Sequence, residues 1–135
     1  MKARDVMNDR VVVAAVGAKG GDIASELLSG RYSGLPVLGT NGKVLGIVTE
    51  LDLLKIIADG KDPRTMTVEQ IMTQPAVCAL DDEEIQLVIT KMARHNIRRL
   101  PVVREDGKLV GIIARTDILW GWQMQWAKEK LIAVV

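Results

Sequence analysis

The stretch GIVTELDLL, from Gly46 to Leu54, returns 65 residues later as GIIARTDIL, from Gly111 to Leu119. Both copies open with Gly-Ile, keep an aspartate at the same place and end in leucine, whereas Thr49 becomes Ala114. Each copy is apolar and β-branched at its start and helix-favouring at its end, which is typical of a strand that runs into a helix. The repeat predicts that the chain consists of two related halves.

The same offset of 65 residues aligns most of the chain. Leu35-Pro36-Val37 matches Leu100-Pro101-Val102, and no insertion is needed between Met7 and Leu119. A repeat that leaves an apolar face uncovered is stabilised when it stacks on its copy. We therefore expect one module with pseudo-two-fold symmetry, made of repeats 1–62 and 63–135, with related clefts between the halves.

Composition limits the class of protein. The chain has 135 residues, 48% of them hydrophobic, a formal charge of +1 and one cysteine, Cys78. This charge balance favours neither a nucleic-acid nor a membrane partner, and a lone cysteine is typical of a reducing compartment. The N-terminal MKARDVMNDR lacks the apolar core of a signal peptide. We expect a cytoplasmic protein whose core is aliphatic, because the chain contains no phenylalanine.

The pattern of each half predicts the element order βαββα, an α/β fold of the α+β type. The expected elements are a strand at 10–16, a helix at 21–31, a hairpin turning at Asn41-Gly42, a helix closed by Gly60, a strand at 76–80, a helix at 82–96, a hairpin turning at Asp106-Gly107 and a helix from about Arg115. Thr67 and Gln70 match a capping box that opens a short helix. Because glycines lower helix propensity, GAKGG predicts a frayed or displaced start for the first long helix.

The junction chemistry has two interpretations. Thr49 and Asp52 stand at the start of a helix, where unpaired N–H groups attract phosphate, and a carboxylate there can accept hydrogen bonds from ribose hydroxyls. Alternatively, Thr-x-x-Asp is an N-cap with an acid in the first turn, worth about 1 kcal/mol without any ligand. The retained Asp117 favours the ligand interpretation, because Ala114 has no hydroxyl with which to cap a helix.

Each half resembles a cystathionine β-synthase (CBS) domain. The resemblance rests on DVM and QIM before the first strand, GLPVL and RLPVV at the start of the hairpin, and the strand-to-helix junction quoted above. It implies a tandem pair, called a Bateman module, whose halves pack through their sheets. It also implies two clefts for adenine nucleotides (AMP, ADP or ATP), no catalytic cofactor, and regulation of a partner protein that the sequence does not identify.

The resemblance assigns residues to two unequal clefts. The better cleft would contain Ile47, Thr49, Asp52, Ala76, Val77, Ile97, Arg98, Arg99 and Pro101, with Ile47, Val77 and Ile97 lining the adenine and both arginines reaching phosphate. The weaker cleft would contain Val11, Val12, Tyr32, Ser33, Gly34, Pro36, Ile112 and Asp117, without the threonine and the arginines. The alternative for the arginines is a solvated turn before a strand.

Other features favour a binding module over an enzyme. With one histidine and no spacing typical of metal ligands, the sequence predicts neither a catalytic constellation nor a metal site. The rival functions are a ligand-free structural or protein-interaction domain, and a binder of another adenosyl ligand such as S-adenosylmethionine or NAD. Trp120, Trp122 and Trp126 diverge around one helix, so some indole surface should meet another surface. We expect a homodimer contact there, with packing on the same chain as the alternative.

Overall fold

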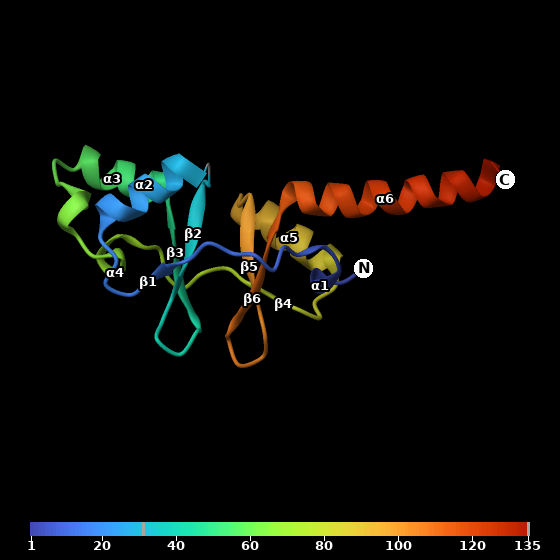
Figure 1. The fold of residues 1–135 in the computed structure, drawn as a ribbon, viewed down its shortest axis with the longest axis horizontal. Helices are drawn as coiled ribbons and strands as arrows, with labels where there is room; N and C mark the ends of the chain where they lie inside the picture. Colours follow the sequence, from blue (N-terminus) through green and yellow to red (C-terminus); the bar gives the residue numbers. More distant parts are fainter. Residues whose placement is uncertain (31, 135) are drawn as a thin grey trace. The chain divides into compact units, whose positions relative to one another are not determined.

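The computed structural model describes the backbone of residues 1–30 and 32–134 and the side chains of residues 1–30 and 32–125. Contacts divide the chain into two compact units, each containing one small sheet and its helices (Figure 1). Unit 1 comprises Met1–Val11, Val77–Arg104 and Val110–Val135, and unit 2 comprises Val12–Ala76 and Glu105–Leu109. Each unit therefore includes the segment that leads into the other repeat, and the repeat boundaries at 1–62 and 63–135 stay a prediction about the sequence.

Unit 2 contains a three-stranded sheet of order β1-β2-β3. Its elements are β1 (Ala14–Ala15), α2 (Gly20–Gly30), β2 (Gly34–Leu38), β3 (Val44–Thr49), α3 (Glu50–Ala58), the 3₁₀ helix η1 (Pro63–Thr65) and α4 (Val68–Ile71). β1 pairs with β2 in parallel, and β2 pairs with β3 as the expected antiparallel hairpin. Gly42 adopts the positive φ of 79° that the hairpin turn requires.

Unit 1 repeats the arrangement with the sheet order β4-β5-β6. Its elements are α1 (Ala3–Val6), β4 (Ala79–Leu80), α5 (Ile85–His95), β5 (Arg99–Val103), β6 (Leu109–Ala114) and α6 (Arg115–Val134). The predictions of a second hairpin and of a long final helix from about Arg115 are confirmed. The mixed α/β fold class is confirmed as well.

The two cores are aliphatic and follow the repeat offset of 65 residues. The buried pairs are Ala14 and Ala79, Ile23 and Val88, Leu27 and Met92, Leu35 and Leu100, Val37 and Val102, Val48 and Ile113, and Leu53 and Ile118. Ala3 and Val68 extend the series, but each lies in the core of the unit that holds the other repeat's sheet. The short helices α1 and α4 therefore complete the cores by exchange between the repeats.

Both first strands are shorter than predicted. The sequence predicts strands at 10–16 and 76–80, whereas only Ala14–Ala15 and Ala79–Leu80 form ladders. The parallel register pairs just these residues with β2 and β5. The chain changes units at Val11–Val12 and again at Ala76–Val77, so the residues next to these points have no ladder partner in the sheet that follows.

The prediction of a frayed first helix is wrong. α2 begins at Gly20, whereas its counterpart α5 begins only at Ile85 rather than at residue 82. The Gly20 N–H donates to the Met66 carbonyl at 2.9 Å, and a Cβ on Gly20 would collide with the Pro63 carbonyl. The glycine is used for close approach of η1, and this tertiary contact outweighs its low helix propensity of about 1 kcal/mol.

The short helix opened by Thr67 is confirmed. The backbone N–H of Thr67 donates to Oε1 of Gln70 at 3.0 Å, the second half of a capping box for α4.

Candidate functional site

The β3–α3 junction is organised around the Asp52 carboxylate. Thr49 has an extended backbone and is the N-cap of α3, and its hydroxyl oxygen accepts a hydrogen bond from the Asp52 N–H at 3.2 Å. Asp52 Oδ2 in turn accepts from the Thr49 N–H at 2.8 Å and from the Thr49 hydroxyl at 3.0 Å. The capping interpretation of Thr49 and Asp52 is therefore confirmed, and any ligand role is additional to it.

A residue that the sequence analysis missed, Thr73, completes this junction. Its hydroxyl donates to Asp52 Oδ1 at 2.9 Å. Its backbone forms an antiparallel bridge with Ile47, with N–O distances of 3.0 and 2.8 Å. Gly46 allows this approach, since a Cβ there would lie 2.6 Å from the Thr73 carbonyl oxygen. The motif QIM ends one residue before Thr73, and the hydroxyl directly after it was the available signal.

The β6–α6 junction retains only part of this arrangement. Asp117 Oδ2 accepts from the Ala114 N–H at 2.7 Å. Ala114 offers no hydroxyl, and Asn8, the repeat counterpart of Thr73, bridges Ile112 through its backbone while its Oδ1 accepts from the Arg10 N–H. The argument that Asp117 needs a ligand to explain it is wrong, because a carboxylate at this position satisfies the N-cap N–H whatever the N-cap side chain is.

Each predicted cleft combines residues of both units, so the clefts themselves remain predictions. Unit 2 holds Ile47, Thr49, Asp52 and Ala76 of the better cleft and Val12, Tyr32, Ser33, Gly34 and Pro36 of the weaker one. Unit 1 holds Val77, Ile97, Arg98, Arg99 and Pro101 of the better cleft and Val11, Ile112 and Asp117 of the weaker one.

Within unit 2, two residues assigned to the weaker cleft lie directly behind the better junction. Gly34 pairs with Thr49 across β2 and β3, and a Cβ on Gly34 would lie 3.1 Å from the Thr49 methyl group. The Ser33 carbonyl accepts from the N–H of Glu50, the first residue of α3. These two residues therefore shape the Thr49 backbone.

Burial separates residues that could touch a ligand from residues that shape the site. Pro36 and Pro101 are fully buried, so their side chains can only position the strands. Arg98 is exposed and Arg99 is half-buried. The Arg98 carbonyl accepts from the Arg115 N–H at 3.0 Å, which ties the arginine pair to the start of α6.

Cys78 has the surroundings of a structural thiol. It is half-buried in unit 1, and burial raises the pKa of its thiol, against a smaller opposing effect from Lys91. The thiol is therefore protonated at neutral pH, which makes it a weak nucleophile. Among the side chains that the structure describes, no group of three or more histidine, cysteine or acidic residues could hold a metal ion.

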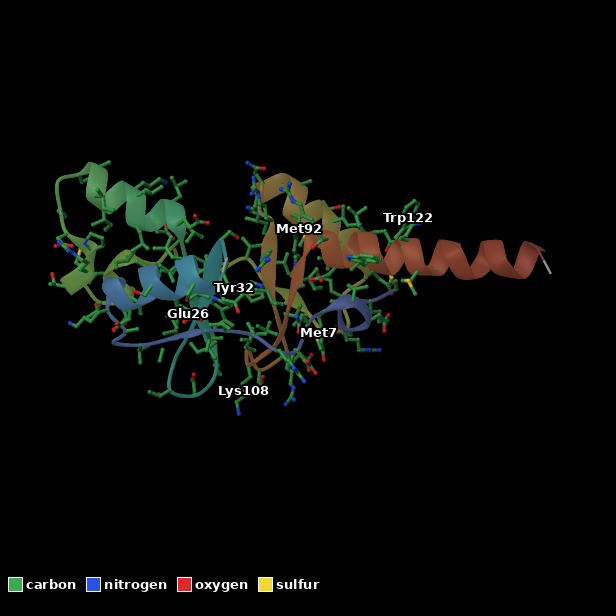
Figure 2. All side chains as sticks on the ribbon, turned by 45° about the horizontal axis from the view of Figure 1, so that its top comes forward. Met7, Glu26, Tyr32, Met92, Lys108 and Trp122 are labelled. Carbon is green, nitrogen blue, oxygen red and sulfur yellow. The ribbon has the colours of Figure 1, made fainter. Side chains whose placement is uncertain are left out.

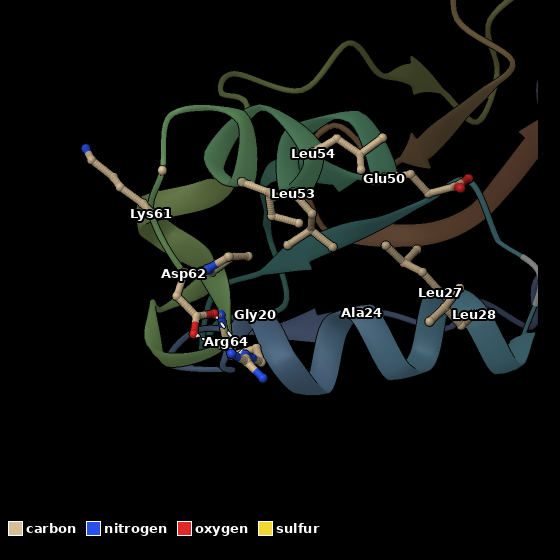
Figure 3. A pocket seen from close by; sticks show the side chains of 13 residues that line it. Gly20, Ala24, Leu27, Leu28, Glu50, Leu53, Leu54, Lys61, Asp62 and Arg64 are labelled. Carbon is tan, nitrogen blue, oxygen red and sulfur yellow. Dashed lines mark hydrogen bonds and ion pairs between the residues drawn. The ribbon is translucent and has the colours of Figure 1, made fainter.

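An apolar groove of 590 Å³ lies between α2 and α3 in unit 2 (Figure 3). Leu27 and Leu53 face each other across it, and Leu28 and Leu54 are exposed at its edge. Asp62 and Arg64, joined by an ion pair of 2.8 Å, lie at one end. The Arg64 side chain lowers the pKa of the Asp62 carboxyl through hydrogen bonds and charge.

Unit 1 has a second apolar surface on α6. Leu119, Trp120, Trp122 and Met124 are each more than half exposed, and the Trp122 side chain is labelled on α6 in Figure 2. The third tryptophan of the predicted contact, Trp126, lies outside the described side chains. Within the described part of the chain, no helix is both long and apolar enough to cross a bilayer.

Two hairpin sheets, exchanged short helices and paired strand-to-helix junctions define a tandem repeat of one small α/β domain. The chain belongs to the CBS domain family, whose model matches residues 3–59 and 68–121. A homoserine O-acetyltransferase of Methanococcoides burtonii is 37% identical over 114 residues, which are 84% of this chain and 22% of that enzyme. An uncharacterized protein of Methanopyrus kandleri is 32% identical over 117 residues. The chain spans 57% of that protein's length.

Solved structures of CBS domain pairs have the same fold. The CBS domain pair of protein MJ0100, in complex with 5′-methylthioadenosine and S-adenosyl-L-methionine, has a TM-score of 0.79 and 30% identity. This match covers 91% of this chain and 98% of that one. CBSX2 in complex with AMP has a TM-score of 0.81 and 25% identity, covering 91% of this chain and 96% of that one.

Proposed function

We propose that this chain is a non-enzymatic regulatory module that binds adenine nucleotides (AMP, ADP or ATP) and passes the binding on to a partner protein. The observation that carries the proposal is the Asp52 carboxylate, fixed at the start of α3 and already accepting a hydroxyl donor, Thr73, at 2.9 Å. A ribose hydroxyl offers the same donor chemistry. The AMP and S-adenosylmethionine complexes of related CBS pairs support an adenosyl ligand.

The proposed better cleft assigns one task to each group of residues. Asp52 accepts from the ribose, while Ile47, Val77 and Ile97 contact the adenine. Arg98 and Arg99 bind phosphate, because fork-shaped guanidinium donors match its oxygens. In the weaker cleft Asp117 accepts from the ribose, and the positions of the two arginines are taken by Ser33 and Gly34. We therefore expect the weaker cleft to hold phosphate poorly.

Two alternatives follow from specific observations. The relative bound to 5′-methylthioadenosine and S-adenosyl-L-methionine favours a sulfur-containing adenosyl ligand, with NAD as a further candidate. The closed capping box favours a ligand-free interaction domain, because Thr49 and Asp52 stabilise α3 without any ligand.

Isothermal titration calorimetry with AMP, ADP, ATP, NAD and S-adenosylmethionine tests the proposal. A ligand at one hundred times its dissociation constant should also stabilise the fold by about 2.7 kcal/mol in a thermal-shift assay. Saturable binding of AMP, ADP or ATP supports the proposal, and binding of S-adenosylmethionine or NAD alone favours the alternative ligand. If none of the five binds, the interaction domain is the better description.

We also propose that the chain forms a homodimer through α6. The indole surfaces of Trp120 and Trp122 are more than half exposed, and aromatic residues are enriched at interface cores. A two-fold contact would bring the same patch together from both chains. The groove between α2 and α3 is a second apolar face for the regulated partner protein or the other chain.

A further inference from the structure

The two junction carboxylates differ in how many hydrogen bonds they can still accept. An ionised carboxylate has two oxygens with about four acceptor positions in total. Asp52 Oδ2 already accepts twice, from the Thr49 N–H and from the Thr49 hydroxyl. Oδ1 accepts once, from the Thr73 hydroxyl. Asp52 therefore has one acceptor position left, on Oδ1.

Asp117 has more capacity. Its Oδ2 accepts once, from the Ala114 N–H, and among the described residues no donor lies within hydrogen-bond distance of its Oδ1. The side chain is half-buried rather than enclosed. Three acceptor positions are left, and both oxygens contribute to them. A pair of neighbouring hydroxyls can therefore bind one to each oxygen.

The geometry points to different sugar requirements at the two junctions: Asp117 takes an intact ribose diol, whereas Asp52, with Thr73 in place, takes a single hydroxyl. Thr73 is then the residue that sets the specificity of the Asp52 junction. The inference rests on the proposed function, since it concerns how an adenosyl ligand is held. For the ribose alone it reverses the expected order of the two clefts, while the phosphate order, which depends on Arg98 and Arg99, is unchanged.

The consequence concerns the class of ligand. A nucleotide whose ribose lacks one hydroxyl, or carries a substituent there, remains acceptable at Asp52 provided that the hydroxyl donating to Oδ1 is intact. The Asp117 junction would discriminate against such a ligand, because it would lose one of two charge-assisted hydrogen bonds there. A bond of that kind corresponds to about tenfold or more in affinity.

Calorimetry with AMP, 2′-deoxy-AMP and 3′-deoxy-AMP tests the inference on chains with one working junction. In Asp117→Ala, which leaves Asp52, we expect one deoxy analogue to bind about tenfold more weakly than AMP and the other to bind within twofold of AMP. In Asp52→Ala, which leaves Asp117, both analogues should bind about tenfold more weakly. Equal losses for both analogues in Asp117→Ala would overturn the inference.

The decisive variant is Thr73→Val in the Asp117→Ala chain. Valine keeps the shape and the backbone bridge to Ile47 but removes the donor, so Oδ1 is free and both analogues should now bind about tenfold more weakly than AMP. Thr73→Ser restores a hydroxyl and should return the single-hydroxyl pattern. An unchanged pattern in Thr73→Val overturns the inference while leaving the proposed function standing. Absence of AMP binding to the parent chain or to Asp117→Ala overturns it too, and in the parent chain also contradicts the proposed nucleotide function.

Discussion

The substitution Asp52→Ala should separate the structural role of this carboxylate from its proposed ligand role. It removes the acceptor of three hydrogen bonds, from the Thr49 N–H, the Thr49 hydroxyl and the Thr73 hydroxyl. The Thr49 hydroxyl can still cap the N–H of residue 52, so half of the capping box survives. Because the carboxylate is half-buried and each net hydrogen bond is worth about 0.5–1.5 kcal/mol, we expect a loss of about 1–2 kcal/mol in unfolding free energy.

The binding effect should be of similar size but separable. Loss of the ribose acceptor should weaken AMP binding more than tenfold, or about 1.4 kcal/mol, measured by calorimetry on protein shown to be folded by circular dichroism. Gln70→Ala is the matched control: it removes the same kind of backbone acceptor, at 3.0 Å from the Thr67 N–H, but in α4. It should lower stability and leave AMP binding unchanged. A folded Asp52→Ala chain that binds AMP as tightly as the parent would refute the ribose assignment.

Three further predictions concern phosphate, assembly and packing. Arg98→Ala should weaken AMP binding but barely change adenosine binding in calorimetry; equal losses for both ligands would point to an effect on folding. A chain ending after Leu119 should sediment as a monomer where the parent is a dimer, and a truncated chain that still dimerises would remove the tryptophan helix from the interface. Gly20→Ala should lower the unfolding free energy in urea by about 1–3 kcal/mol, because its Cβ meets the Pro63 carbonyl. Gly21→Ala, whose nearest neighbour would be 3.5 Å away, should be neutral or stabilising, and equal losses in both variants would contradict the packing argument.

Sequence reasoning predicted the parts of the fold that depend on local pattern. The hairpin around Asn41-Gly42 has a turn that needs a positive φ, and the helix after Thr49 has its cap and its closing Gly60. The 65-residue offset reproduces the buried pairs, such as Leu35 with Leu100, because burial in equivalent strands imposes the same residue types. These features are encoded within a few residues of where they appear.

What sequence reasoning missed depends on contacts distant in the chain. Gly20 reads locally as a poor helix former, and only the approach of Pro63 explains it. Thr73 lies 21 residues from Asp52, and no local pattern announces their hydrogen bond. Asp117 was interpreted as a ligand group because the cap was judged by the side chain of Ala114, whereas the bond actually uses the Ala114 N–H.

The exchange of α1 and α4 has a consequence for how such a chain can be divided. A cut between residues 62 and 63 would leave the first fragment with α1 but without α4, and the second with α4 but without α1, so neither would hold the short helix that fills its own core. Two such fragments should restore the fold only when mixed. By the same geometry, a single-repeat ancestor would have been complete only as an intertwined pair of identical chains, and fusion of its gene to a copy would have made that mutual dependence permanent.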